Sequence, residues 1–133
     1  MATGMSLRFE VFVADLEATV DFYTGVLGFA VGKDDRSGIP PYVALSRDHV
    51  HVGAVASWEQ VPPERRLPPT GVELVLEVDD LAAELVRVSA TGWPLHEGPT
   101  RRPWGLVDAR LLDPDGHYLR LTGRAGDDGG LGR

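Results

Sequence analysis

An internal repeat constrains the fold of this chain more than any other feature. Near the start, LRFEVFVADLEATVDFYTGVLGF reads as an apolar strand, then Asp-Leu, then a helix with apolar residues at Leu16, Val20 and Tyr23. The later segment VELVLEVDDLAAELVRVSATGW repeats this pattern, with apolar residues again at Leu81, Leu85 and Val88. Spacings of four and three residues place each set on one face of a helix. The chain is therefore predicted to be an internal duplication.

The residues that flank each predicted helix support the duplication. Asp15 and Asp80 stand where an N-cap carboxylate accepts from free backbone N–H groups, and Gly28 and Gly92 stand where a left-handed residue ends a helix. Short β-like runs follow, YVALS and HVHVGAVA in the first half and LVDARLL and HYLRL in the second, the last two joined by an Asp-Pro-Asp-Gly turn. We therefore predict an α+β fold of two βαβββ modules that form a curved mixed sheet around a cleft.

Proline and glycine mark the predicted boundaries of the modules. The segment VPPERRLPPTG carries four prolines, which disfavour both helix and central strand. Residues 61–70 are therefore interpreted as a linker between a first module at 1–60 and a second module at 71–122. The tail at 123–133, GRAGDDGGLGR, has almost nothing to bury and is predicted to be disordered.

Composition limits the classes of function. Thirteen Lys and Arg against 20 Asp and Glu give a net charge of −7, which disfavours nucleic acid and anionic lipid and favours cationic small molecules. No apolar run approaches the roughly 20 residues of a membrane span, and the first residues lack a secretory signal, so a cytoplasmic location is expected. Without cysteine, the chain has no disulfide and no thiolate nucleophile.

Three motifs carry a family resemblance: VADLEATVDFYTGVLGF, VDDLAAEL and DPDGHYLRL. Over residues 6 to 122 the chain resembles the vicinal oxygen chelate superfamily of glyoxalases, extradiol dioxygenases and bleomycin resistance proteins. SRDHVHVGAV and RPWGLVDARLLDPDG are most similar to the bleomycin resistance proteins, whose signature includes Pro-Trp-Gly. The resemblance implies a homodimer with two grooves between the subunits, in which the first strand can be exchanged.

The resemblance also indicates where metal-dependent members carry their ligands. Those positions correspond here to Arg8, Glu73 and Arg120, with a fourth near Gly53. Arginine stays protonated and offers only hydrogen-bond donors, so it cannot give a lone pair to a cation. We therefore predict that the ancestral metal site is lost and that no cofactor is bound. Arg8 and Glu73 are related by the duplication, and an ion pair between them is a further prediction.

A second interpretation retains a metal. His49 and His51 are two residues apart on a predicted strand and would share a face, although a third ligand is not evident beside them. His51 and Glu73 would then be the displaced ligands of a glyoxalase-like lyase or an extradiol-type dioxygenase. No Ser, His and Asp pattern with local support for a nucleophile is visible in the sequence, so no catalytic residue is assigned.

A cavity without metal can still bind a small molecule. The resemblance implies a bleomycin-like or other antibiotic, cationic and aromatic, which needs aromatic faces for stacking and carboxylates for charge. Trp104, in the Pro-Trp-Gly motif, is the leading candidate for a stacking wall, and core packing is the alternative. The other predicted ligand-binding residues are Trp58, Tyr42, Phe29, Asp34, Asp35 and Arg120. The predicted function is sequestration of the ligand in a groove at the dimer interface, without catalysis.

Overall fold

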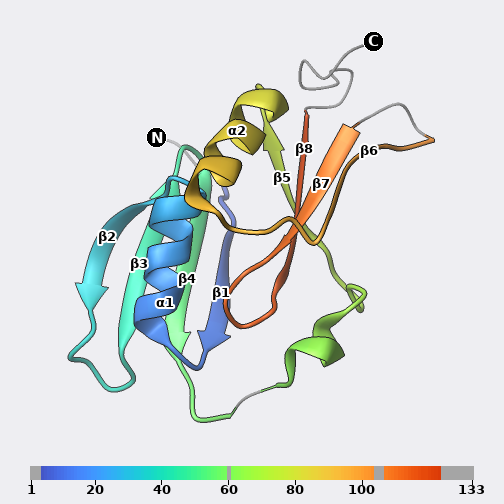
Figure 1. Ribbon diagram of the computed structural model, residues 1–133. Coiled ribbons are helices and arrows are strands. Elements are labelled where there is room, and N and C mark those ends of the chain that lie inside the picture. Colours follow the sequence, from blue (N-terminus) through green and yellow to red (C-terminus); the bar gives the residue numbers. More distant parts are fainter. Residues whose placement is uncertain (1–3, 60, 104–106, 124–133) are drawn as a thin grey trace. The chain divides into compact units, whose positions relative to one another are not determined.

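The computed structural model describes residues 4–59, 61–103 and 107–123 (Figure 1). The chain divides into two compact units, Met1–Gln60 and Val61–Arg133. The first unit contains β1 (Arg8–Val13), α1 (Leu16–Asp21), a π-helical turn η1 (Phe22–Val26), β2 (Ala30–Asp35), β3 (Tyr42–Arg47) and β4 (Val50–Ala56). The second contains a 3₁₀ helix η2 (Pro63–Arg66), β5 (Leu74–Val78), α2 (Leu81–Thr91), β6 (Glu97–Arg101), β7 (Val107–Leu112) and β8 (Tyr118–Gly123).

Both units have the same sheet topology. The strand orders are β1-β4-β3-β2 and β5-β8-β7-β6. In each unit the first strand is therefore at one edge of the sheet, and the last strand lies beside it inside the sheet. Those two strands pair in parallel, while the other neighbours are antiparallel. The predicted α+β class with two βαβββ modules is therefore confirmed.

One face of each sheet is apolar and carries the core. In the first unit, Val11, Val52 and Val43 are buried on neighbouring strands, and α1 contacts β3 and β4. In the second unit, the buried residues Leu119 and Leu121 lie on β8, which α2 contacts. Strict alternation along these strands sends every second side chain to the opposite face. That opposite face is where polar side chains can gather.

The predicted caps form in both helices. Asp15 Oδ1 accepts a hydrogen bond from the backbone N–H of Ala18, and Asp80 Oδ1 accepts from that of Ala83, each at 3.0 Å. Gly92 ends α2 with φ at 79°, a left-handed conformation that glycine adopts without steric cost. The first helix is shorter than predicted, because α1 gives way at Asp21 to the π-helical turn.

Several local boundaries differ from the prediction. The segment interpreted as a linker contains η2, because proline fits the first turn of a helix, where its missing N–H costs nothing. His49 lies in a turn before β4, so it does not share a strand face with His51. The strand β6 was not recognised, since EGPTR lacks an apolar run. Gly123 belongs to β8, and the rest of the predicted tail lies outside the described residues.

Candidate functional site

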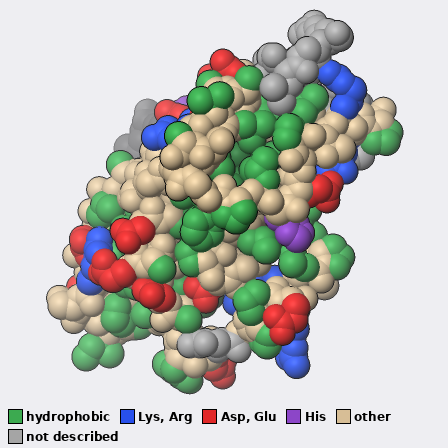
Figure 2. Space-filling model, viewed as in Figure 1, with side chains coloured by type: hydrophobic (Ala, Val, Ile, Leu, Met, Phe, Trp, Pro, Cys, Tyr) green, Lys and Arg blue, Asp and Glu red, His purple; other side chains and the backbone are tan. Residues whose placement is uncertain are grey.

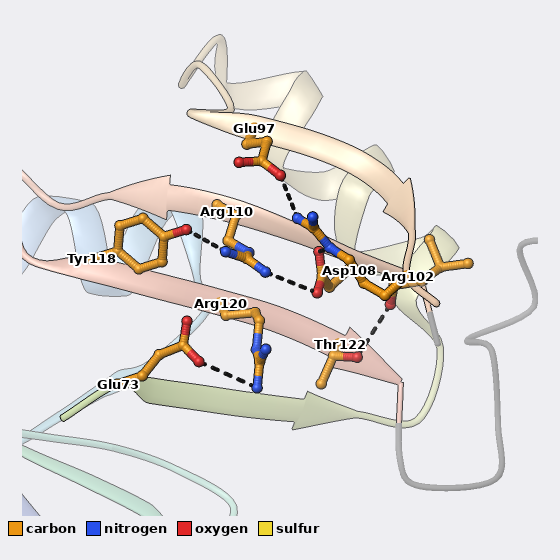
Figure 3. Close-up of polar contacts among 9 residues, drawn as sticks. Glu73, Glu97, Arg102, Asp108, Arg110, Tyr118, Arg120 and Thr122 are labelled. Carbon is orange, nitrogen blue, oxygen red and sulfur yellow. Dashed lines mark hydrogen bonds and ion pairs between the residues drawn. The ribbon is translucent and has the colours of Figure 1, made fainter. Parts of the chain in front are cut away.

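A charged network covers the non-core face of the second sheet. Ala109 and Leu111 of β7 are buried beside Leu119 and Leu121 of β8, so the intervening residues point to the other side. We call the residues of that side the polar face (Figure 3). Its members are Glu73, Glu97, Arg102, Asp108, Arg110, Tyr118, Arg120 and Thr122.

Asp108 is the centre of the network, with its side chain only 1% exposed. Its Oδ1 accepts from Arg102 Nε at 2.9 Å, and its Oδ2 accepts from Arg110 Nη2 at 3.2 Å. Arg102 also donates to Glu97, and Arg110 also donates to the hydroxyl of Tyr118. A buried carboxylate is stable only when its charge and its lone pairs are both compensated. The two guanidinium groups provide that compensation.

The same contacts shift three pKa values. Burial alone would lower the pKa of Arg110, but the hydrogen bonds to Tyr118 and Asp108 outweigh it and raise the pKa above its ordinary value. The hydrogen bonds to Glu97 and Asp108 raise the pKa of Arg102. The hydrogen bond from Arg102 lowers the pKa of Glu97 below its usual 4.5. Arg102 and Arg110 therefore stay protonated, and Glu97 stays ionised, near neutral pH.

Arg120 lies next to this network on β8. Its Nη2 is 3.3 Å from Oε1 of Glu73, which precedes β5, and the two side chains are 23% and 28% exposed. Of the buried side-chain polar atoms in the described residues, only the Nε atoms of Arg110 and Arg120 have no hydrogen-bond partner. The polar face therefore holds donors that its own carboxylates do not use.

In the first unit, the corresponding face carries a smaller polar group. Arg8 Nη2 lies 3.4 Å from Glu10 Oε1 on the same strand. Gly53 faces Glu10 across the β1–β4 ladder, and a Cβ atom at Gly53 would lie 1.8 Å from Glu10 Oε2 and 2.7 Å from the Tyr42 hydroxyl oxygen. The absence of a side chain at Gly53 thus leaves room for the Glu10 carboxylate and the Tyr42 hydroxyl above the sheet. Arg8 and Glu73 each have an ion-pair partner inside their own unit, and the predicted pair between them stays a prediction.

The residues at the expected metal positions do not fit a metal ion. Arg8 and Arg120 are guanidinium groups, and Glu73 is engaged by Arg120. His51 is exposed on β4, opposite Arg8. Among the described residues, no group of three or more His, Cys, Asp or Glu side chains is arranged to hold a metal. Two of the expected metal positions, Arg8 and Arg120, therefore carry cationic groups that cannot give a lone pair to a divalent cation.

The predicted aromatic residues have different environments. Trp104 lies outside the described residues. Trp58 follows β4 and is 90% exposed, so its ring is accessible. Tyr42 begins β3 and is half-buried, with its hydroxyl above Gly53. Phe29 is buried in the core of the first unit, where its ring meets Tyr23 edge to face at 5.6 Å.

The two predicted acidic residues, Asp34 and Asp35, are the last residues of β2. Asp34 Oδ1 accepts from Arg36 Nε at 3.1 Å, and Arg36 Nη1 is 2.6 Å from Glu17 of α1. Figure 2 shows acidic and basic side chains gathered around α1 and β2 in this unit. Asp35 is half-buried, with its carboxylate beside Gly38. The charge of Asp34 is therefore already neutralised by a neighbour.

A pocket of about 360 Å³ opens at one end of the second unit. It is lined by Trp93, Pro94, Leu95, His96, Leu112, Asp113 and Pro114. The indole N–H of Trp93 donates to the carbonyl of Leu112 at 3.0 Å, which fixes the ring as one wall. Next to it, Asp113 Oδ2 lies 2.8 Å from His117 Nδ1. This pocket was not anticipated, because its residues come from two loops that are about 20 positions apart.

The sequence contained a signal for the polar face that was not used. In VDARLL, Asp108 and Arg110 are two residues apart, and in HYLRL, Tyr118 and Arg120 are two residues apart. In each strand the intervening residues are apolar, a pattern of alternation that puts the polar pair on one side. Of these four residues, only Arg120 was predicted to be a site residue.

Comparison with protein families identifies the chain. The model of the Glyoxalase/Bleomycin resistance protein/Dioxygenase superfamily matches residues 6–121. The chain belongs to this superfamily. A search of curated proteins finds no significant match.

Several solved structures are similar to this chain. TnmS3, an antibiotic binding protein from Streptomyces sp. CB03234, is 28% identical with a TM-score of 0.67, over 92% of this chain and 98% of that one. A glyoxalase/bleomycin resistance protein from the same organism is also 28% identical, with a TM-score of 0.64 over 89% and 99% of the chains. The fosfomycin resistance protein FosX from Listeria monocytogenes, in complex with Mn(II), is 13% identical with a TM-score of 0.72, over 92% and 93%. This last likeness shows the fold alone.

The described residues also bear on membrane association. None of their helices is both long enough and apolar enough to span a bilayer.

Proposed function

We propose that this member of the superfamily binds an antibiotic or a similar small molecule and uses no protein-bound metal to do so. The observation that carries the proposal is the ion pair between Arg120 and Glu73. The resemblance places metal ligands at both positions, and here a guanidinium group occupies one of them and engages the carboxylate at the other. A binding protein needs only a complementary surface, whereas a metal-dependent enzyme of this family needs the ligand set.

The comparisons support the antibiotic as the kind of ligand. TnmS3, 28% identical over nearly the whole chain, is described as an antibiotic binding protein. Antibiotic sequestration requires no chemistry, only a dissociation constant below the working concentration of the drug and protein in excess of it. A bleomycin-like or other antibiotic, cationic and aromatic, remains the ligand that the sequence predicts.

The assembly belongs to the same proposal. We infer a homodimer with a ligand groove between subunits, as the family resemblance implies. β1 is an edge strand of its sheet, and Phe12 on it is 57% exposed, which leaves apolar surface for a partner strand. Sedimentation velocity of the purified protein at several concentrations tests this inference, and a monomer at all of them would contradict it.

Two measurements test the function. The first is elemental analysis of untagged protein after incubation with Zn²⁺, Ni²⁺, Fe²⁺ and Mn²⁺ and gel filtration, with less than about 0.1 metal per chain expected. The second is titration of the protein, in the presence of EDTA, with a panel of antibiotics that includes bleomycin. Calorimetry and Trp fluorescence measure the binding.

The outcomes separate the two classes of function. Saturable binding of an antibiotic in EDTA, at one ligand per groove, supports the binding protein. About one metal per chain, lost on Glu73→Ala or His51→Ala, would instead support a lyase or dioxygenase with displaced ligands. Absence of binding across the panel would contradict antibiotic sequestration.

A further inference from the structure

Two arginines of the polar face stand directly opposite each other. Arg110 of β7 and Arg120 of β8 are partners in the antiparallel ladder, so their side chains leave the sheet on the same side. Figure 3 shows both side chains on neighbouring strands of the polar face. Like charges directly opposite each other are unfavourable in a sheet. A negatively charged or hydrogen-bond-accepting group near the two guanidinium groups would reduce the repulsion between them.

The carboxylates of the polar face do not fully provide that group. Both oxygens of Asp108 are used, one by Arg102 and one by Arg110. Glu73 pairs with Arg120 through a single contact of 3.3 Å to Nη2. After these contacts, the Nε–H groups of Arg110 and Arg120 remain buried and unsatisfied. Buried donors without an acceptor are rare in folded proteins and indicate a missing partner.

The missing partner must be an acceptor. A guanidinium group has five N–H donors and no lone pair, so neither a cation nor a hydrogen-bond donor can satisfy it. Carboxylate and phenolate oxygens are the strongest acceptors for such donors, because both sides of the hydrogen bond are then charged. The side chains of Arg110 and Arg120 are 13% and 23% exposed, so their guanidinium groups border solvent, while the Nε atoms themselves are buried. A ligand oxygen therefore reaches these Nε–H groups only with a small displacement of the arginine side chains.

We propose that the polar face binds an oxyanion, a carboxylate or phenolate oxygen of the ligand, between Arg110 and Arg120. This inference rests on the proposed binding function and names the group that the ligand presents to the second sheet. It differs from the sequence prediction of a cationic ligand, which rested on the net charge of −7 and on the resemblance to bleomycin resistance proteins. The described donors of this face require an acceptor, whatever charge the other end of the ligand carries.

Small aromatic probes test the site without knowledge of the natural ligand. Benzoate, neutral benzamide and cationic benzylamine have the same ring and differ in charge. The arginine Nε–H signals of labelled full-length protein are followed by ¹H–¹⁵N NMR during titration with each probe. Benzoate is expected to shift the Arg110 and Arg120 signals with a dissociation constant in the millimolar range, and benzylamine is expected to shift neither.

Two variants test the donors, and two more are controls. Arg120→Lys keeps the positive charge but removes the guanidinium fork, so benzoate affinity should fall at least fivefold. Glu73→Gln frees the Nη2 donor of Arg120 and removes a negative charge, so benzoate affinity should rise severalfold. Arg87→Gln, on the exposed side of α2, and Glu64→Gln, in η2, are the matched controls and should leave the affinity unchanged.

The results distinguish this inference from the proposed function. If an antibiotic binds in EDTA but benzoate moves neither Nε–H signal and Arg120→Lys leaves both affinities unchanged, the oxyanion site is overturned and the binding function stands. If benzoate binds with the expected pattern of variants and no antibiotic binds, the site stands and antibiotic sequestration is overturned. Equal shifts with benzoate and benzylamine would also overturn the oxyanion site, because charge would then not matter.

Discussion

Arg120 and Glu73 form an ion pair, with Nη2 of the arginine 3.3 Å from Oε1 of the glutamate. Both side chains are about a quarter exposed, so the pair contributes at most about 1 kcal/mol to the free energy of unfolding. Its importance is chemical. It places a permanent cation beside a carboxylate that could otherwise serve as a metal ligand.

Asp108 is expected to be the residue of the polar face that matters most for stability. Asp108→Asn removes a buried negative charge that two guanidinium groups share, and it leaves Arg102 and Arg110 undercompensated. Breaking a buried ion pair by removing one partner costs about 3 kcal/mol or more. Urea denaturation followed by circular dichroism should show a loss of this size.

A matched control for this variant is Asp48→Asn. Asp48 is 83% exposed and lies 3.9 Å from Arg47, a pair of the weak surface kind. Its loss should change the free energy of unfolding by less than about 0.5 kcal/mol. A similar effect in both variants would mean that Asp108 is not held as the structure indicates.

The pKa of Glu97 predicts a dependence of stability on pH. Because the hydrogen bond from Arg102 lowers this pKa in the folded state, the folded protein binds fewer protons than the unfolded one as the pH falls below 4.5. The stabilisation is therefore present above the unfolded pKa and is lost as pH falls through the lower folded pKa. The difference in Tm between the wild type and Glu97→Gln should be larger at about pH 6 than at about pH 3. An equal difference at both pH values would contradict the shift.

Most of the fold could be predicted from the sequence, because the repeat and its caps are local signals. Asp15 and Asp80 cap their helices, and Gly92 ends α2, as the residue types indicate. β6 could not be predicted in this way. Its segment, EGPTR, is an edge strand that pairs with β7 alone, and an edge strand needs no apolar run.

The candidate site was predicted less well, for a physical reason. Arg120 was predicted because it occupies a position where metal-dependent members of the family carry a ligand. Its partner in the ladder, Arg110, matches no family motif. The interaction of these residues depends on the register of β7 against β8, which places Arg110 opposite Arg120 and Asp108 opposite Thr122. Register is a property of the folded sheet, set by turn geometry and by packing of the buried face.

Gly116 is expected to be required by the turn that joins β7 and β8. Its φ is +86°, and a Cβ atom there would lie 2.5 Å from Pro63 Cβ and 2.9 Å from Pro63 Cα. Gly116→Ala combines an unfavourable backbone conformation with a clash against η2, so the free energy of unfolding should fall by at least about 2 kcal/mol. Thermal unfolding measures the loss. Gly25→Ala, in η1, is the control, because no described atom beyond its chain neighbours and its own helical turn lies within 4 Å of the added Cβ. It should leave the free energy of unfolding unchanged or raise it by up to about 1 kcal/mol.

Arg120→Glu tests whether the arginine is what keeps a divalent cation away from Glu73. The variant replaces a guanidinium group with a second carboxylate next to Glu73, and neighbouring carboxylates are suitable ligands for Mn²⁺. Titration with Mn²⁺, followed by the loss of its free EPR signal, should show binding in the variant at least about tenfold tighter than in the wild type. Arg87→Glu makes the same change of charge on the exposed side of α2 and should leave Mn²⁺ affinity near that of the wild type. Tight Mn²⁺ binding by the wild type would contradict the argument, since Arg120 would then not exclude the metal.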